Sequence, residues 1–170
     1  MADPDEDAAQ QARARALASP LRMRILRLCL HEPRTNKELA GMLGINPGSM
    51  LHHVRSLVAT GFLEPGEPRR GTRGAREVPY RATRRSWGTH VPGVGSILLE
   101  TFLQEVEGLQ PDDLNATRLG LKISPQRREE MLERFHALFQ EYAAAESDPD
   151  GEAISLFFVE HPDRQGSAGD

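Results

Sequence analysis

The sequence predicts a mainly helical α+β protein in which a basic amino-terminal half precedes a smaller acidic α/β region. Apolar residues recur at three- and four-residue steps in most segments, and only short segments alternate as strands do. Residues 11–90 contain 15 Lys or Arg against 5 Glu, whereas residues 91–170 contain 6 bases against 16 acids. A charge division of this size indicates two roles, with a polyanion as the partner of the basic half.

Composition excludes several classes of protein. The chain has 170 residues, of which 38% are hydrophobic and 27% charged, as in an ordinary globular protein. No apolar run approaches the ~20 residues that a transmembrane helix needs. The opening residues are acidic, unlike the basic start of a signal peptide. The single cysteine, Cys29, can form neither an internal disulfide nor a thiolate metal cluster. We therefore expect a cytoplasmic protein with no membrane partner.

The first elements are predicted from helix formers and caps. Residues 1–10 carry four acids and no base, which favours a disordered acidic tail, and residues 8–18 are rich in helix formers. Ser19 and Pro20 favour a new helix start, with a capping hydroxyl followed by a ring that fits the first turn. Cys29 falls on the apolar face of this second helix, so we expect it to be a small core residue.

Two more helices follow in quick succession. Thr35 and Glu38 have the spacing of a capping box, and the short helix that they begin ends at Gly44. Asn46-Pro47 begins a third helix that runs to Thr60, with apolar residues on one face and polar residues on the other. Two helices joined by a tight turn, the second longer and polar outside, form a helix-turn-helix.

A hairpin is predicted directly after this motif. Residues 62–64 form a short strand, residues 65–76 a loop rich in Gly, Pro and Arg, and residues 77–83 the returning strand. Pro79 cannot donate a backbone hydrogen bond, so the returning strand is expected at the edge of its sheet. A long hairpin with arginines at its tip, placed after a polar helix, is a wing.

The sequence resembles ArsR-type winged-helix regulators over roughly residues 15–85. The run ASPLRMRIL at 18–26 is similar to the opening helix of that family, and LHHVRSLVATGFLE at 51–64 to its recognition helix and the start of its wing. The resemblance implies a homodimer that binds DNA as a repressor or activator. Metal-sensing members carry paired cysteines, whereas Cys29 is alone, so neither metal sensing nor an inducer carries over.

Candidate DNA-binding residues follow from this placement. Ser49, His52 and Arg55 lie on the polar face of the third helix, where side chains can reach base edges. Arginines of a wing loop typically contact phosphates or the minor groove. His53 matches a histidine of the family, and structural support and phosphate contact are equally good interpretations of it. The predicted set is Pro47, Ser49, His52, His53, Arg55, Arg69, Arg70, Arg73 and Arg76.

Residues 91–162 are predicted to form a small α/β region for dimerisation, and possible ligand sensing, followed by a disordered tail at 163–170. The expected order is a helix at 94–109, a strand at 116–123, a helix at 124–145 and a strand at 153–159. The first helix carries an apolar stripe that suits a second subunit as well as the chain's own core. The stripe consists of Val94, Ile97, Leu98, Phe102 and Val106.

The sequence as a whole predicts a sequence-specific, double-stranded-DNA-binding transcription regulator, a homodimeric repressor on a palindromic operator. A small-molecule effector of unspecified identity is compatible with the second half. The alternative is a winged-helix protein-interaction module without specific DNA binding. Motifs of common enzymes are absent, so no catalytic residue is predicted. No cofactor or metal site is expected, because adjacent His52 and His53 point about 100° apart on a helix.

Overall fold

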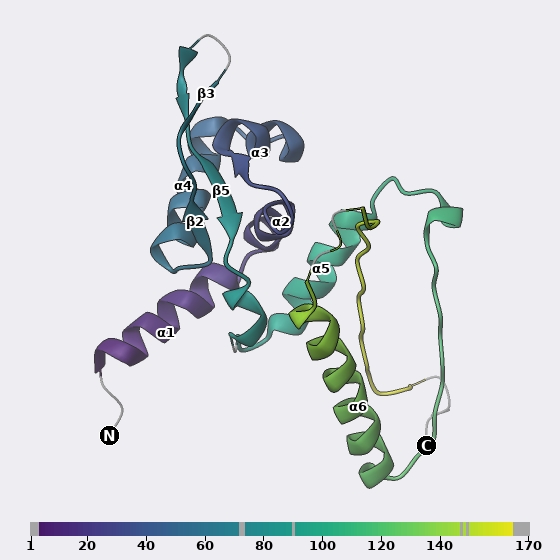
Figure 1. Ribbon diagram of the computed structural model, residues 1–170. Helices are drawn as coiled ribbons and strands as arrows, with labels where there is room; N and C mark the ends of the chain where they lie inside the picture. Colours follow the sequence, from purple (N-terminus) through teal and green to yellow (C-terminus); the bar gives the residue numbers. More distant parts are fainter. Residues whose placement is uncertain (1–3, 72–73, 90, 147, 149, 165–170) are drawn as a thin grey trace. The chain divides into compact units, whose positions relative to one another are not determined.

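The computed structural model describes residues 4–71, 74–89, 91–146, 148 and 150–164 (Figure 1). The chain divides into two compact units, Met1–Gly108 and Leu109–Asp170. The sequence prediction places the division earlier, at 90/91. Each unit is described by itself below.

The first unit begins with two helices, α1 (Pro4–Leu17) and α2 (Pro20–Leu28). Residues 4–10 belong to α1, so the predicted acidic tail is helical in its described part. Glu6 and Asp7 stand near the amino-terminal end of the helix, where its dipole favours negative charge. The predicted start of α2 is confirmed, because the Ser19 side chain accepts a hydrogen bond from the backbone N–H of Arg22.

The helix-turn-helix consists of α3 (Asn36–Leu43) and α4 (Pro47–Ala59). The capping box is confirmed: Thr35 Oγ1 accepts from the Glu38 N–H at 3.2 Å, and the Glu38 carboxylate accepts from the Thr35 N–H at 2.7 Å. Gly44 ends α3 in the left-handed conformation, with φ 64°. These local signals set the short turn between the two helices.

The sheet of this unit has three short strands in the order β1 (Arg34–Thr35), β5 (Pro79–Ala82), β2 (Leu63–Pro65). All pairs are antiparallel. The prediction that Pro79 lies in an edge strand is wrong, because β5 is the central strand. Pro79 is tolerated as the first residue of β5, where its carbonyl accepts from the Gly66 N–H at 2.8 Å.

The wing extends from this sheet as β3 (Arg69–Arg70) paired with β4 (Arg76–Glu77), and it forms the long arm beyond β2 and β5 in Figure 1. The short helix η2 (Arg85–Gly88) then leads to α5 (Val94–Val106), which packs against α2. One core underlies these elements, with Leu17, Ile25, Leu39, Met50, Val54, Leu57 and Phe62 almost completely buried. Cys29 is also fully buried there, as predicted.

The second unit contains η3 (Pro111–Asp113) and α6 (Pro125–Ala144). Ser124 caps α6 as predicted, accepting a hydrogen bond from the Arg127 N–H. The strands predicted at 116–123 and 153–159 are not formed, because neither segment belongs to a sheet ladder in the described chain. No described residue of this unit is buried. Among the described residues, no helix is both long and apolar enough to cross a membrane.

Candidate DNA-binding surface

Helix α4 is held at its start by polar contacts to the chain around it. Asn46 Oδ1 accepts a hydrogen bond from the Gly48 N–H at 2.8 Å and so caps the helix. The Asn36 side-chain amide, in the first turn of α3, donates to the Pro47 carbonyl at 2.9 Å. The two helices of the motif are therefore joined by a side-chain contact as well as by the turn. This contact helps to fix the orientation of α4 relative to α3.

The two faces of α4 have opposite character. Met50, Val54 and Leu57 are fully buried on the inner face. Ser49, His52 and Arg55 follow one another at three-residue steps on the outer face and are exposed. The 13 residues of the helix span about 20 Å at 1.5 Å per residue, and an α-helix fits the major groove of B-DNA. The outer face thus offers a hydroxyl, an imidazole and a guanidinium. Pro47 is exposed at the start of the same helix.

His53 lies apart from this face. Its side chain is partly buried, and its Nδ1 is buried without a hydrogen-bond partner in the described chain. Burial lowers the pKa of His53, and the nearby charges of Arg22 and His52 lower it further. His53 is therefore a half-buried imidazole, in contrast to the exposed side chains of Ser49, His52 and Arg55.

Three other basic residues of the helical core make contacts within the protein. Arg22 donates to the carbonyls of Ala16 and Arg15 and thereby closes the carboxyl-terminal end of α1. Arg24 Nη1 lies 3.5 Å from the Gln104 side-chain oxygen of α5, and Arg27 forms an ion pair with Glu105 of the same helix. These cations join α1, α2 and α5, so the positive charge of the unit is partly structural.

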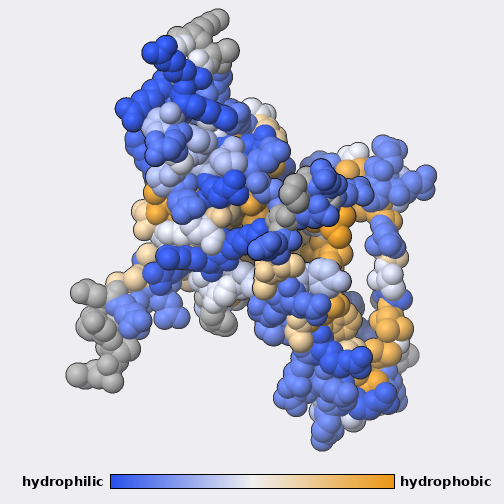
Figure 2. Space-filling model, viewed as in Figure 1, coloured by the Kyte–Doolittle hydropathy of each residue, from blue (hydrophilic) through white to orange (hydrophobic). Residues whose placement is uncertain are grey.

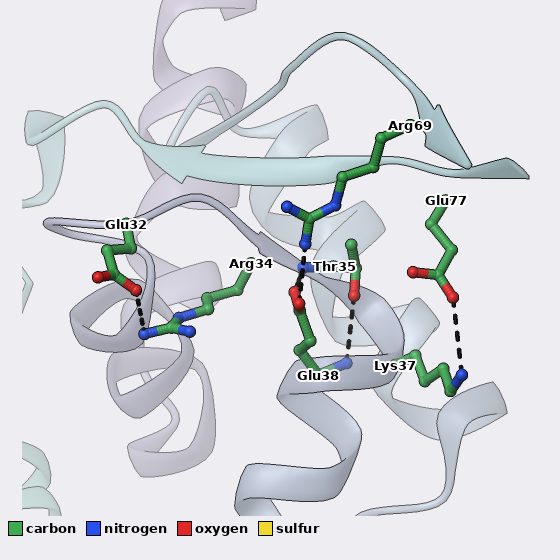
Figure 3. A network of polar contacts seen from close by, with 7 residues as sticks. All are labelled: Glu32, Arg34, Thr35, Lys37, Glu38, Arg69 and Glu77. Carbon is green, nitrogen blue, oxygen red and sulfur yellow. Dashed lines mark hydrogen bonds and ion pairs between the residues drawn. The ribbon is translucent and has the colours of Figure 1, made fainter. Parts of the chain in front are cut away.

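The base of the wing is tied to the start of α3 (Figure 3). The Arg69 guanidinium donates to Glu38 Oε1 at 2.8 Å, while Glu38 Oε2 accepts from the Thr35 N–H. Lys37 Nζ and Glu77 Oε1 lie 3.7 Å apart. The Thr35 N–H, and to a smaller extent the charges of Arg69 and Arg34, lower the pKa of Glu38. Two ion pairs thus hold β3 and β4 against the helix-turn-helix, and one of them uses a predicted phosphate-binding arginine.

The remaining wing arginines differ from Arg69. Arg70 and Arg76 are direct partners across the β3–β4 ladder, and both are exposed. Neither forms an ion pair in the part of the chain that the structure describes. Like charges facing each other across a ladder are unfavourable in isolation, and an anion placed between them relieves the repulsion. Arg73, the fourth predicted arginine, lies outside the described residues.

The residues of the predicted dimerisation stripe on α5 differ in their surroundings. Val94 packs against the core, Thr101 is buried, and the Thr101 hydroxyl donates to the Ile97 carbonyl at 2.7 Å. Leu98, Phe102 and Val106 are partly exposed. The more exposed apolar residues of α5 are Leu99 and Leu103, which the sequence-based stripe omits. They lie on another side of the helix from Thr101, which only the packing against α2 reveals.

Two shallow hollows lie beside the sheet near the base of the hairpin. The larger measures 540 Å³ and is lined in part by Glu64, Arg81, Arg84 and Arg85. The smaller measures 270 Å³ and shares Arg85 with it. The structure contains no cluster of three or more potential metal ligands within its described ranges.

A family model described as a helix-turn-helix domain matches residues 17–65, which include α2, β1, α3, α4 and β2. A search of curated protein sequences found no match.

Three solved structures show a distant likeness. An ArsR-like transcriptional regulator from Rhodococcus sp. RHA1 is 19% identical, with 83% of this chain and 99% of that chain covered and a TM-score of 0.39. MarR is 18% identical, with 74% and 79% covered and a TM-score of 0.35. The transcriptional regulator Tm0710 from Thermotoga maritima is 15% identical, with 82% and 91% covered and a TM-score of 0.37.

Residues 17–65 match a helix-turn-helix domain, and the β3–β4 hairpin that follows gives the first unit the arrangement of a winged helix-turn-helix.

Proposed function

We propose that this protein is a cytoplasmic, sequence-specific DNA-binding transcription regulator that acts as a homodimeric repressor. The observation that carries the proposal is the outer face of α4, where Ser49, His52 and Arg55 are exposed beside an exposed, basic wing. Hydrogen-bonding side chains at three-residue steps can follow successive base edges in a major groove. We infer that these three residues read the operator, with Pro47 close to the backbone at the helix start.

The wing supplies the electrostatic part of the proposal. Arg70 and Arg76 are exposed and have no ion pair in the described chain, so they are available to phosphates. Arg69 is held by Glu38 and is available only if that ion pair opens. We therefore propose Arg70 and Arg76, and Arg73 by its place between them, as the principal phosphate contacts. His53 supports the helix from its inner side.

A homodimer suits this arrangement because helix-turn-helix dimers bind half-sites about 34 Å apart on a palindromic operator. The exposed side of α5 around Leu99 and Leu103, together with Leu98, Phe102 and Val106 of the predicted stripe, is the proposed contact within the first unit. Repression follows if the bound dimer covers a promoter. A small effector would act only by binding more tightly to one of two arrangements of the α4 helices.

The proposal is tested by selecting bound sites from random duplex DNA and measuring the affinity of the selected site at several salt concentrations. We expect a palindromic consensus and a slope of log affinity against log salt that corresponds to several neutralised phosphates. Binding without any consensus, or no binding, would contradict the proposal and favour a protein-interaction module. A promoter fusion carrying the selected site then tests repression against activation.

A further inference from the structure

Residues 116–123 have the pattern of a strand but no strand partner. Leu119, Leu121 and Ile123 alternate with Arg118, Gly120 and Lys122. Leu119 is 74% exposed and Leu121 49% exposed. No backbone hydrogen bond involves residues 115–123 in the part of the chain that the structure describes. An extended segment of this kind presents a row of unpaired N–H and C=O groups, which is a template for another strand.

Residues 153–159 form a second extended segment in the same unit, and it is anchored at one end. The Phe158 ring stacks on Phe135 of α6 with centroids 4.4 Å apart. Glu160 accepts two hydrogen bonds from Arg128 of α6, at 2.7 and 2.8 Å. Ile154 and Leu156 lie outside this anchor and are 74% and 70% exposed. The anchor therefore fixes the segment on α6 while it leaves apolar side chains in solvent.

This exposure is more than scattered surface residues would explain. Orange, hydrophobic residues reach the surface of the second unit in Figure 2, whereas the wing of the first unit is blue. The helix α6 has no buried residue either, although Leu138 and Tyr142 belong to its apolar stripe. Contiguous exposed apolar surface on a soluble protein marks a contact surface. The exposed apolar residues of 116–123 and 153–159 therefore fit a partner that is an extended strand with apolar side chains.

Charge identifies which segments fit one another. The segment 116–123 carries Arg118 and Lys122 and no acid, whereas the segment 153–159 carries no base and follows Glu152, and Glu160 at its other end is already bound by Arg128. Pairing either segment with its own copy would bring like charges together, and pairing unlike segments brings opposite charges together. Within the described part of one chain the two segments form no ladder with each other. A second copy supplies both complements at once, and a twofold axis closes the assembly.

We propose that residues 116–123 become a strand only in a dimer, where they pair with residues 153–159 of a second copy of this chain. The contact is separate from α5 and makes the two second units mutually dependent. The contact rests on the proposed homodimer but on neither α5 nor DNA binding, so a dimer whose 116–123 amides exchange freely would contradict it and leave the proposed function standing. The proposed pairing also means that the strand predicted at 116–123 finds its partner strand in another chain rather than in its own.

The test is hydrogen–deuterium exchange of the full-length protein, read by mass spectrometry on peptides from 116–123, with sedimentation at matched concentrations. Amides without hydrogen bonds exchange at the rate of an unfolded peptide. We expect a dimer in which exchange across 116–123 is slowed at least tenfold, and loss of that protection on dilution into monomers. This arm needs no variant, so it stands even if a substitution disturbs folding.

Two variants and a matched control locate the contact. Leu121→Asp and Leu156→Asp should each remove the protection of 116–123, with the helix signal in circular dichroism retained and with any dimer held through α5 still present. Met42→Asp changes a residue of α3 with nearly the same exposure as Leu121, 50% against 49%, and should leave the protection of 116–123 in place.

Three results would overturn the proposal. The first is a protein that stays monomeric at all concentrations. The second is a dimer whose 116–123 amides exchange freely, or whose protection survives dilution into monomers. The third is loss of protection with Leu121→Asp but not with Leu156→Asp, which would mean that 116–123 pairs with something other than 153–159.

Discussion

The two units have similar amphipathic patterns but differ in how far their apolar residues are buried. In Met1–Gly108 the apolar faces of α2, α3 and α4 meet in one core, where side chains such as Phe62 and Thr35 are only 1% exposed. In Leu109–Asp170 the apolar stripe of α6 and both extended segments remain at the surface, and no described residue is buried. The pattern shows which residues favour burial, and it does not show which chain covers them.

The largest difference between the units should appear in the free energy of unfolding. Phe62→Ala removes a ring that is 1% exposed, and we expect it to lower the free energy of unfolding by about 3–5 kcal/mol. Tyr142→Ala removes a ring of α6 that is 71% exposed, and the expected change is within about 0.5 kcal/mol. Urea denaturation measures both. Equal losses would mean that Tyr142 is covered in solution.

The reactivity of a thiol gives a second measure of the same contrast. Burial raises the pKa of Cys29 to about 11 from 9.0. Since the thiolate is the nucleophile, native Cys29 should be alkylated roughly 100-fold more slowly than an ordinary thiol at neutral pH. In a Cys29→Ser background, Gln140→Cys on exposed α6 supplies that ordinary thiol. Comparable alkylation rates by mass spectrometry would show that the core of the first unit opens readily.

Two glycines of the helix-turn-helix make a smaller, matched test. Gly44 has φ +64°, so Gly44→Ala should destabilise the first unit by about 1–2 kcal/mol. Gly41 lies within α3 and has no atom within 4 Å of an added Cβ. Gly41→Ala should therefore stabilise the protein by about 0.5–1 kcal/mol. Thermal unfolding distinguishes the two directions, and destabilisation by both substitutions would show that α3 is not packed as described.

The smallest expected effect concerns the Glu38 carboxylate that joins the capping box to Arg69. Glu38→Gln keeps an acceptor for the Thr35 N–H and loses the ion pair, so we expect a loss of about 0.5 kcal/mol at neutral pH. The folded-state pKa of Glu38 lies below its ordinary value of 4.5. Its contribution is therefore complete above pH 4.5 and is lost as the pH falls through the folded-state pKa. A difference between wild type and variant that persists in stronger acid would contradict this assignment.

Local chemistry explains what the sequence predicts well. The starts of α2, α3, α4 and α6 follow from Ser19, Thr35, Asn46 and Ser124, because a cap and its helix lie within a few residues of each other. The outer face of α4 follows in the same way from its period. These features needed no knowledge of distant contacts.

Contacts between distant residues explain what the sequence does not predict. The strand β1 exists because Thr35 pairs with Pro79, and Pro79 lies in the central strand for the same reason. Arg69 is bound by Glu38, 31 positions away, so composition alone could not separate it from Arg70. In the second unit, alternation at 116–123 indicates a strand, but no part of the described chain supplies its partner.

The most direct test of the account is a comparison of Arg55→Ala with Arg70→Ala on the selected operator and on random duplex DNA over a range of salt. We expect Arg55→Ala to cost about 1–3 kcal/mol on the operator and to relax preference at particular base pairs, with an unchanged salt slope. Arg70→Ala should weaken binding to both DNAs equally and reduce the salt slope by about 0.9. Identical behaviour of the two variants would contradict the division between base recognition by α4 and phosphate binding by the wing.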